Sequence, residues 1–251
     1  MSEEKIRLQK YVAGQGICSR RKAEDLIKQG LILVNDKKVE LGTKIDPNTD
    51  RIKVLGDFAN EKIDNKYNQE KVLIALNKPI DYICSTTSSH GISIMELLSP
   101  ENFWKKAKPI IKGRVYPVGR LDKDSEGLVL LTNDGELANK LMHPKFSHEK
   151  EYELTIDKML TRDAKKILTN GMNIGDGEYV AGIRIIKVQK IGRKVLLHVI
   201  LQEGKNRQIR KMFGRLGYDL YSLRRIRIAN IKLGTLPIGK WRFINMDKVS
   251  I

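Results

Sequence analysis

The chain has 251 residues, of which 41% are hydrophobic and 31% are charged, a balance that is typical of a globular protein with its own core. Its 47 Lys and Arg residues outnumber its 30 Asp and Glu residues, which gives a formal net charge of +17 and favours a polyanionic partner. We expect nucleic acid to be that partner and exclude a membrane, because no segment forms an amphipathic helix with Trp or Phe on its apolar side.

The cysteines and the apolar runs argue against a metal site and against membrane insertion. Cys18 and Cys84 belong to no CxxC motif and to no Cys/His pair, so the sequence offers no zinc ligand set. No apolar run approaches the roughly 20 residues that cross a bilayer, and the N-terminus lacks the apolar stretch of a secretion signal. We therefore expect a cytoplasmic protein with reduced cysteines and no metal.

Residues 1–55 predict a small domain of two helices followed by a β-hairpin. Leu8, Tyr11 and Val12 follow the i, i+3, i+4 spacing of a short helix. Ser19 is a suitable N-cap for a second helix, which Gly30 ends. The apolar period then changes to two, which indicates strands. The expected strands are residues 31–34 and 39–41, joined by a turn at Asn35 and Asp36, and residues 51–55.

The second of these helices begins with three consecutive cations, Arg20, Arg21 and Lys22. Positive charge at a helix N-terminus is unfavourable unless an anion is bound there, so the arrangement indicates a phosphate site, with a solvated charged surface as the alternative. The segment RLQKYVAGQGICSRRKAEDLIKQGLILVNDKKV resembles the S4 RNA-binding domain. The resemblance implies that these three residues, together with Lys10 and Lys28, contact RNA phosphates.

Residues 56–70 are polar and have no clear period, and we interpret them as a linker to a second domain at residues 71–251. In the second domain, strand-like segments follow one another more often than they alternate with helices, which predicts an α+β fold with a mixed, largely antiparallel sheet. The expected helices are residues 136–142, 161–170 and 207–216. The expected strands are residues 72–76, 114–118, 128–131, 152–156, 195–201 and 223–233.

Asp122 is the first candidate for a catalytic residue. It lies in the turn at residues 119–122, between an apolar strand that ends at Val118 and another that begins at Leu128. A carboxylate between two rigid elements, beside the cation Arg120, suits covalent or electrostatic catalysis. An Asp in a turn also commonly hydrogen-bonds its own backbone, so the pattern alone leaves both roles open. The competing carboxylates, which are better explained as turn or capping residues, are Asp124, Glu126 and Asp134.

Three blocks of sequence carry a more specific signal: PVGRLDKDSEGLVLLTNDG at residues 117–135, HEKEYEL at 148–154 and EGKNRQIRKM at 203–212. Together they resemble the pseudouridine synthases that have an N-terminal S4 domain and act on ribosomal RNA. The resemblance implies that Asp122 is the essential residue and that Tyr152 lies against the target base.

The same resemblance implies that Arg210 pairs with Asp122, and it leaves Arg120, Arg207 and Lys211 to bind RNA. The residues alone have simpler explanations. Tyr152 suits the core of a strand, and the three cations of the last block suit a solvated face of a helix whose N-cap is Asn206.

The resemblance implies a catalytic domain of the pseudouridine synthase type that isomerises one uridine of a structured ribosomal RNA stem-loop. The target base must leave its helix, no cofactor is needed, and Asp122 acts as the nucleophile or as the base that removes a sugar proton. The last two blocks favour the large-subunit (23S) branch, and we expect a monomer. One block departs from the family pattern: in NKPIDYICST, residues 77–86, Asp81 stands where a Gly is common.

Two other classes of function remain open from the sequence. A non-catalytic S4-domain RNA-binding or ribosome-assembly factor would explain the basic charge but not the intact catalytic blocks. A helix-turn-helix DNA regulator would leave residues 71–251 unexplained, so we expect no DNA partner.

Overall fold

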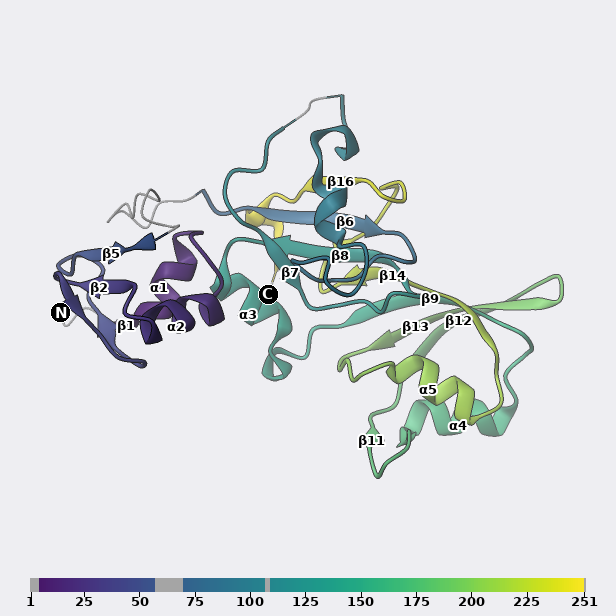
Figure 1. Ribbon diagram of the computed structural model, residues 1–251. Coiled ribbons are helices and arrows are strands. Elements are labelled where there is room, and N and C mark those ends of the chain that lie inside the picture. The colour runs from purple at the N-terminus through teal and green to yellow at the C-terminus, as the bar shows by residue number, and fades with distance from the viewer. Residues whose placement is uncertain (1–4, 57–69, 107–108, 251) are drawn as a thin grey trace. The chain divides into compact units, whose positions relative to one another are not determined.

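The computed structural model describes residues 5–56, 70–106 and 109–250 (Figure 1). These residues form two compact units, which are described separately. The first is the described part of Met1–Lys71 with Ile111–Val115 and Asn133–Gly135, and the second is the described part of Val72–Ile110, Tyr116–Thr132 and Glu136–Ile251. Of the expected linker, residues 57–69 lie outside the described residues.

The N-terminal unit contains the two expected helices. The first is α1 (Leu8–Gly14) and the second is α2 (Arg20–Lys28). Ser19 is the N-cap of α2, as expected, and its hydroxyl accepts a hydrogen bond of 3.1 Å from the backbone N–H of Lys22. The short strands of this unit are β1 (Ile6–Arg7), β2 (Ile32–Val34), β3 (Lys37–Lys38), β4 (Lys44–Ile45) and β5 (Ile52–Val54).

The hairpin forms at the expected turn, but its second strand differs from the prediction. Asn35 and Asp36 have φ angles of 52° and 62°, so the turn uses only two residues, both left-handed. Residues 37–38 therefore pair at once with residues 33–34, and the strand expected at residues 39–41 is not formed. β2 then pairs with β5, which gives the sheet order β3-β2-β5.

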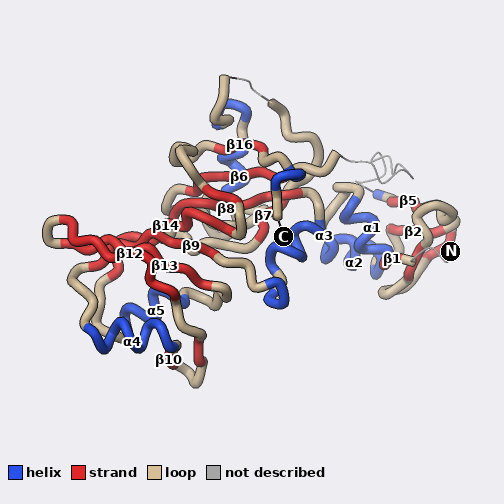
Figure 2. The backbone as a smooth tube through the Cα atoms, turned by 180° about the vertical axis from the view of Figure 1, so that it is seen from behind, coloured by secondary structure: helices blue, strands red, loops and turns tan. Residues whose placement is uncertain are grey.

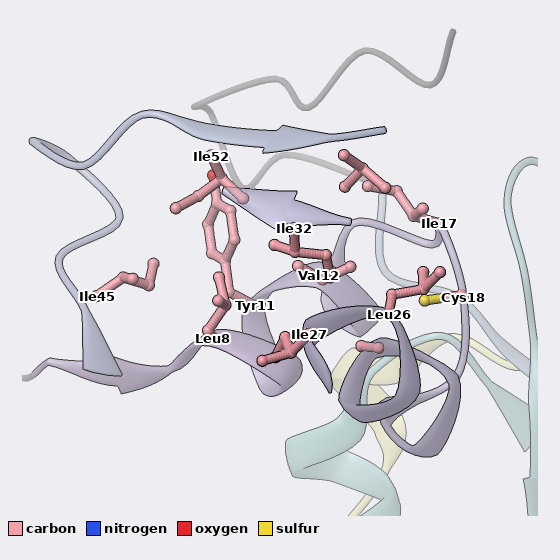
Figure 3. Close-up of a cluster of buried hydrophobic side chains, with 12 residues drawn as sticks. Leu8, Tyr11, Val12, Ile17, Cys18, Leu26, Ile27, Ile32, Ile45 and Ile52 are labelled. Carbon is pink, nitrogen blue, oxygen red and sulfur yellow. The ribbon is translucent and has the colours of Figure 1, made fainter. Parts of the chain in front are cut away.

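The core of this unit is made by one face of each helix and the inner face of the sheet. Figure 3 shows Tyr11 and Val12 of α1 and Leu26 and Ile27 of α2 packed beneath Ile32 of β2. All five side chains are almost fully buried. Apolar residues at helical spacing thus meet apolar residues at strand spacing, which is the packing that the sequence periodicity requires.

The second unit is built on a nine-stranded sheet. Seven strands follow the order β12-β13-β9-β14-β8-β6-β16, while β15 pairs with β14 and β7 pairs with β8. The pairing of β14 with β8 is parallel and the other strand pairings of this sheet are antiparallel, which confirms the mixed, largely antiparallel sheet. The strands are β6 (Leu73–Lys78), β7 (Tyr116–Val118), β8 (Glu126–Thr132), β9 (Lys150–Ile156), β12 (Arg184–Ile191), β13 (Lys194–Leu201), β14 (Leu220–Ile228), β15 (Ile231–Lys232) and β16 (Trp241–Phe243).

Three helices accompany this sheet close to the expected positions. They are α3 (Gly135–Met142), α4 (Arg162–Asn170) and α5 (Gln208–Arg215). Figures 1 and 2 show α4 and α5 side by side, next to the part of the sheet formed by β12 and β13. A two-stranded ribbon of β10 (Met172–Asn173) and β11 (Tyr179–Val180) follows α4.

One expected strand is two strands in the structure. The strand predicted at residues 223–233 ends at Ile228, and Ala229 adopts a φ of 49°, which turns the chain. The chain returns as β15, so that Arg227 pairs with Lys232. Apolar residues alternate on both sides of the turn, at 226 and 228 and again at 231 and 233, which is why the prediction joined the two strands into one.

Gly127 sits where the parallel strands β8 and β14 approach most closely. It pairs with Arg225, and a Cβ atom at position 127 would lie 2.3 Å from the Arg225 carbonyl oxygen. Its φ of 104° is also a conformation that other residues rarely adopt. The contact of the two strands therefore requires glycine at this position.

We expect Gly127→Ala to lower the free energy of unfolding by about 2 to 4 kcal/mol, because the clash adds to the backbone strain. Gly192→Ala is the matched control: it has a φ of 60° but open space around its Cβ position, so it should cost only about 1 kcal/mol. Urea unfolding of the two variants checks this. Equal losses would show that the close approach of the strands is unimportant.

Candidate active site

A cavity of about 1440 Å³ opens in the second unit and brings together most of the residues predicted from the sequence. It is lined by the loop after β7, by β9 and by the segment that leads into α5. The predicted site residues in this lining are Arg120, Asp122, Tyr152, Arg207 and Arg210.

Asp122 lies on the loop at residues 119–125, between β7 and β8, as the sequence predicts. The Ser125 N–H donates to its carbonyl oxygen at 3.1 Å, and the N–H of the buried Leu121 donates to Cys84 Sγ at 3.3 Å. The side chain of Asp122 is 34% exposed and lines the cavity. The carboxylate is thus anchored through its neighbours while its oxygens remain accessible.

Arg207 is the cation that reaches Asp122. Its Nη1 lies 3.8 Å from Asp122 Oδ2, while Nη1 and Nη2 donate to the two carboxylate oxygens of Asp124 at 3.3 and 2.9 Å. The guanidinium therefore makes a two-pronged contact with Asp124 and a weaker ion pair with Asp122. Sequence reasoning assigned Arg207 only to RNA.

Arg210 contacts Asp124, so the predicted pairing of Arg210 with Asp122 is wrong. Its Nη2 donates to the Asp124 carbonyl at 2.6 Å and to Ser125 Oγ at 3.1 Å, and its Nε lies 3.3 Å from Asp124 Oδ2. The two arginines are three residues apart and share one helix face, so spacing alone does not tell which one reaches which carboxylate.

Asp124 is therefore an anchored ion-pair residue and not the solvated turn residue that the sequence suggested. Burial raises the pKa of Asp124, but the hydrogen bond from Arg207 and the charges of Arg210 and Arg207 outweigh it and hold that pKa below its ordinary value. In turn, the hydrogen bond and charge of Asp124 raise the pKa of Arg207.

The start of α5 also differs from the sequence prediction. Asn206 was the expected N-cap, but Arg207 occupies that position with a φ of 51° and makes no side-chain cap. The side chain of Gln208 instead ties the helix to the loop before it: its Oε1 accepts from the Lys205 N–H at 3.1 Å, and its Nε2 donates to Glu203 at 2.7 Å. This arrangement sets Arg207 at the junction of loop and helix, beside the Asp122 loop.

Tyr152 lies in the middle of β9, paired with Val199 of β13 and with Arg225 of β14. Its side chain is 8% exposed and lines the cavity. Tyr152 is thus a core residue whose side chain also faces the cavity. A role in the core of the strand and a role beside the target base are therefore compatible.

The remaining predicted RNA-binding residues lie elsewhere. Arg20, Arg21 and Lys22 are exposed in the first turn of α2, in the N-terminal unit. Lys211 of α5 does not appear in the cavity lining, and its Nζ lies 3.7 Å from Glu178 Oε2. Their contacts with RNA stay predictions.

Lys78 is a residue whose role sequence reasoning missed. It is fully buried at the end of β6, and its Nζ donates to the carbonyl oxygens of Ser125 at 2.7 Å, Pro79 at 2.8 Å and Lys123 at 3.3 Å. Burial lowers its pKa, which the charges of Cys84, Asp124, Asp122 and Asp81 partly oppose. The sequence signal was available: a lysine directly follows five strand residues in a buried segment.

The backbone conformation of Asp81 explains how an aspartate can stand where the family commonly has glycine. It has a φ of 69°, a conformation in which Gly is at ease and Asp is tolerated. Its N–H donates to the Lys123 carbonyl at 2.8 Å. The loop therefore keeps the shape that glycine would give, and it supports the Asp122 loop.

Among the described residues, no group of three or more His, Cys, Asp or Glu side chains could hold a metal ion. None of the helices in the described ranges is long and apolar enough to cross a membrane.

Comparisons with known proteins match both parts of the chain. The family model for RNA pseudouridylate synthase matches residues 72–214, and that for the S4 domain matches residues 6–50. The dual-specificity RNA pseudouridine synthase RluF of Escherichia coli K12 is 36% identical over 99% of this chain and 79% of its own length. The ribosomal large subunit pseudouridine synthase B of Bacillus subtilis is 36% identical over 97% of this chain and 93% of its own.

A solved structure also resembles this chain. The crystal structure of a pseudouridylate synthase superimposes with a TM-score of 0.62, covering 96% of this chain and 97% of the other, at 24% identity. At that identity the likeness shows the fold.

The ion pairs of Asp124 predict a pH dependence of stability. Because the folded pKa lies below the unfolded value of about 3.9, the stabilisation is fully present above the unfolded pKa and is lost as the pH falls through the folded one. We expect Asp124→Asn to be less stable than the wild type near pH 7, with the difference shrinking below about pH 4. Urea unfolding across this range measures it, and a difference that stays constant would contradict the assignment.

Proposed function

The chain belongs to the RNA pseudouridylate synthase family, and from this premise we propose that it converts a uridine of ribosomal RNA to pseudouridine with Asp122 as its catalytic carboxylate. The observation that carries the proposal is the cavity that Asp122 and Tyr152 both line, with Arg207 3.8 Å from the Asp122 carboxylate. An accessible carboxylate, a cation and an aromatic side chain around one cavity are what this isomerisation needs.

The reaction exchanges one bond of the nucleoside for another. The bond from C1′ of the ribose to N1 of the base breaks, the ribose rejoins the base at C5, the C5 proton leaves and N1 gains a proton, so no atoms are gained or lost. Asp122 acts either by attacking the sugar or by removing a sugar proton. Both routes require a carboxylate with free oxygens and a fixed backbone, which the loop supplies.

The cavity suits a base that has left its helix. Its volume exceeds the range of about 300 to 1,000 Å³ that is usual for small-ligand sites, so it leaves room for a nucleotide and the adjoining backbone. Tyr152 offers the flipped base an aromatic surface in place of its lost stacking. Arg120 and Arg207 line the cavity, and in this proposal they bind RNA, while Arg210 supports the turn through Asp124.

The N-terminal unit supplies RNA affinity in this proposal. Arg20, Arg21 and Lys22 bind phosphates at the start of α2, Lys211 adds a backbone contact, and the chain is organised as residues 1–55, a linker at 56–70 and a catalytic domain at 71–251. The target is a uridine in a structured stem-loop of large-subunit RNA, which the name of the Bacillus subtilis relative supports. The enzyme works as a cytoplasmic monomer.

Asp122→Asn is expected to abolish pseudouridine formation while the dissociation constant for RNA changes less than a few-fold, because the amide keeps the shape but loses the charge. Release of tritium from ribosomal RNA labelled at uridine C5 measures the reaction, and filter binding measures affinity. Asp163→Asn, an exposed change on α4, is the matched control and should be fully active. Full activity of Asp122→Asn would refute the assignment, and an inactive wild type that binds RNA would favour the non-catalytic alternative.

Arg210→Ala is expected to lower turnover far more than Arg20→Ala, because Arg210 supports the catalytic loop and Arg20 meets phosphate. Arg20→Ala should mainly weaken binding and reduce the slope of log K against log salt concentration by roughly one. Turnover and binding at several salt concentrations separate the effects. Equal loss of binding in both variants would count against separate roles.

A further inference from the structure

Arg225 of β14 is a buried cation in the wall of the same cavity. Its side chain is 3% exposed, and it lines the cavity together with Asp122 and Tyr152. We propose that Arg225 is a positioning residue of the isomerisation, whose guanidinium fixes the backbone just before Asp122 and thereby sets the position of the catalytic carboxylate. The inference rests on the catalytic role proposed above for Asp122.

The contacts of Arg225 are with backbone carbonyls. Its Nε donates to the Leu128 carbonyl of β8 at 2.8 Å, and its Nη1 donates to the Arg120 carbonyl at 3.3 Å. One planar group thus joins the strand that follows the catalytic loop to the residue two positions before Asp122. A lysine has no such fork, so arginine suits this geometry.

The third nitrogen of the Arg225 guanidinium indicates that a gain in stability does not explain why an arginine is buried at this position. Nη2 is buried and has no hydrogen-bond partner among the described residues. The ion pairs described for this part of the chain give Arg225 no carboxylate. A buried guanidinium without a counter-charge is costly, and an apolar side chain of similar size is often the more stable choice. A role in geometry explains why a cation occupies this place.

The close approach of β8 and β14 brings the guanidinium under the loop. Gly127 leaves no side chain between the strands, as its distance to the Arg225 backbone requires. The neighbouring Arg224 lies in the wall of a different cavity, with Glu153, where its Nη1 is 3.9 Å from Glu153 Oε1. Successive residues of a strand point to opposite faces, so only Arg225 reaches the loop.

Arg225 supplies a support that the other anchors do not. Lys78 and the Asp81 N–H hold the carbonyl of Lys123, after Asp122, and Cys84 accepts from Leu121. The Arg120 carbonyl, which belongs to the same peptide group as the Leu121 N–H, is held by Arg225. Without Arg225 the first half of the loop keeps, within the described part of the chain, only hydrogen bonds to sulfur, from the Leu121 N–H to Cys84 and from the Gly119 N–H to Met142, and sulfur is a weak acceptor. That half can then shift while the second half stays anchored, and a displacement of about 1 Å at a catalytic group lowers a rate by roughly 100-fold.

The test compares Arg225→Met, Arg225→Lys and the neighbouring control Arg224→Met in the full-length protein. We expect Arg225→Met to lower kcat by about 100-fold, with KM and RNA affinity within about three-fold of the wild type. The melting temperature of Arg225→Met should stay within about 5 °C of the wild type.

Arg225→Lys should restore kcat in part, because an ammonium reaches one carbonyl without bridging both. Arg224→Met should keep kcat within about two-fold. Tritium release from C5-labelled ribosomal RNA gives the kinetic constants, and filter binding gives affinity.

The outcomes separate this inference from the proposed function. A folded Arg225→Met enzyme with wild-type kcat overturns the positioning role, as does a loss of kcat that matches a loss of folded protein. Should Arg225→Met fail to fold, Arg225→Lys decides: a wild-type kcat overturns the proposal and an intermediate kcat supports it. Asp122→Asn is measured alongside, because activity in that variant would instead sink the assignment of the catalytic carboxylate.

Discussion

The site depends on how the backbone of the loop between β7 and β8 is held. Two buried cations, Lys78 and Arg225, donate to carbonyl oxygens on either side of Asp122. Each has been removed from water and contacts peptide groups rather than carboxylates, which is an unfavourable use of charge for stability alone. If Asp122 is the catalytic residue that we propose, the arrangement fixes the main chain on both sides of it, which is the support that an active site requires from its surroundings.

The charges around the loop divide their tasks. Asp122 and Asp124 are two residues apart on the same loop. Arg207 contacts both, but it hydrogen-bonds Asp124 and lies 3.8 Å from Asp122, within ion-pair distance and beyond a hydrogen bond. Asp124 thus accepts both hydrogen bonds of the Arg207 guanidinium. Together with Arg210, which donates to its carbonyl oxygen, Asp124 fixes the turn between β7 and β8. The oxygens of Asp122 accept no hydrogen bond from Arg207 and remain accessible in the cavity.

Much of this could be predicted because the signals are local. Apolar periods predicted the helices and most strands, and the turn that carries Asp122 follows from the two strands around it. The partner of Asp122 could not be predicted, since Arg207 and Arg210 share a helix face. The sequence marks Lys78 as the end of a strand, but the partners of Lys78 and Arg225 could not be predicted, because they are distant carbonyl groups, which every residue type has.

The position of β14 has a consequence for the order in which the enzyme is made. This strand lies between β9 and β8, so among the strands of the described residues it is the one that joins the part of the sheet that carries Tyr152 to the part that follows Asp122. Its residues, 220–228, come late in the chain, and pairings over such a sequence separation form slowly. Before this strand has been translated, the two parts of the sheet cannot be joined, so each new copy becomes able to modify RNA only after residues 220–228 have been made.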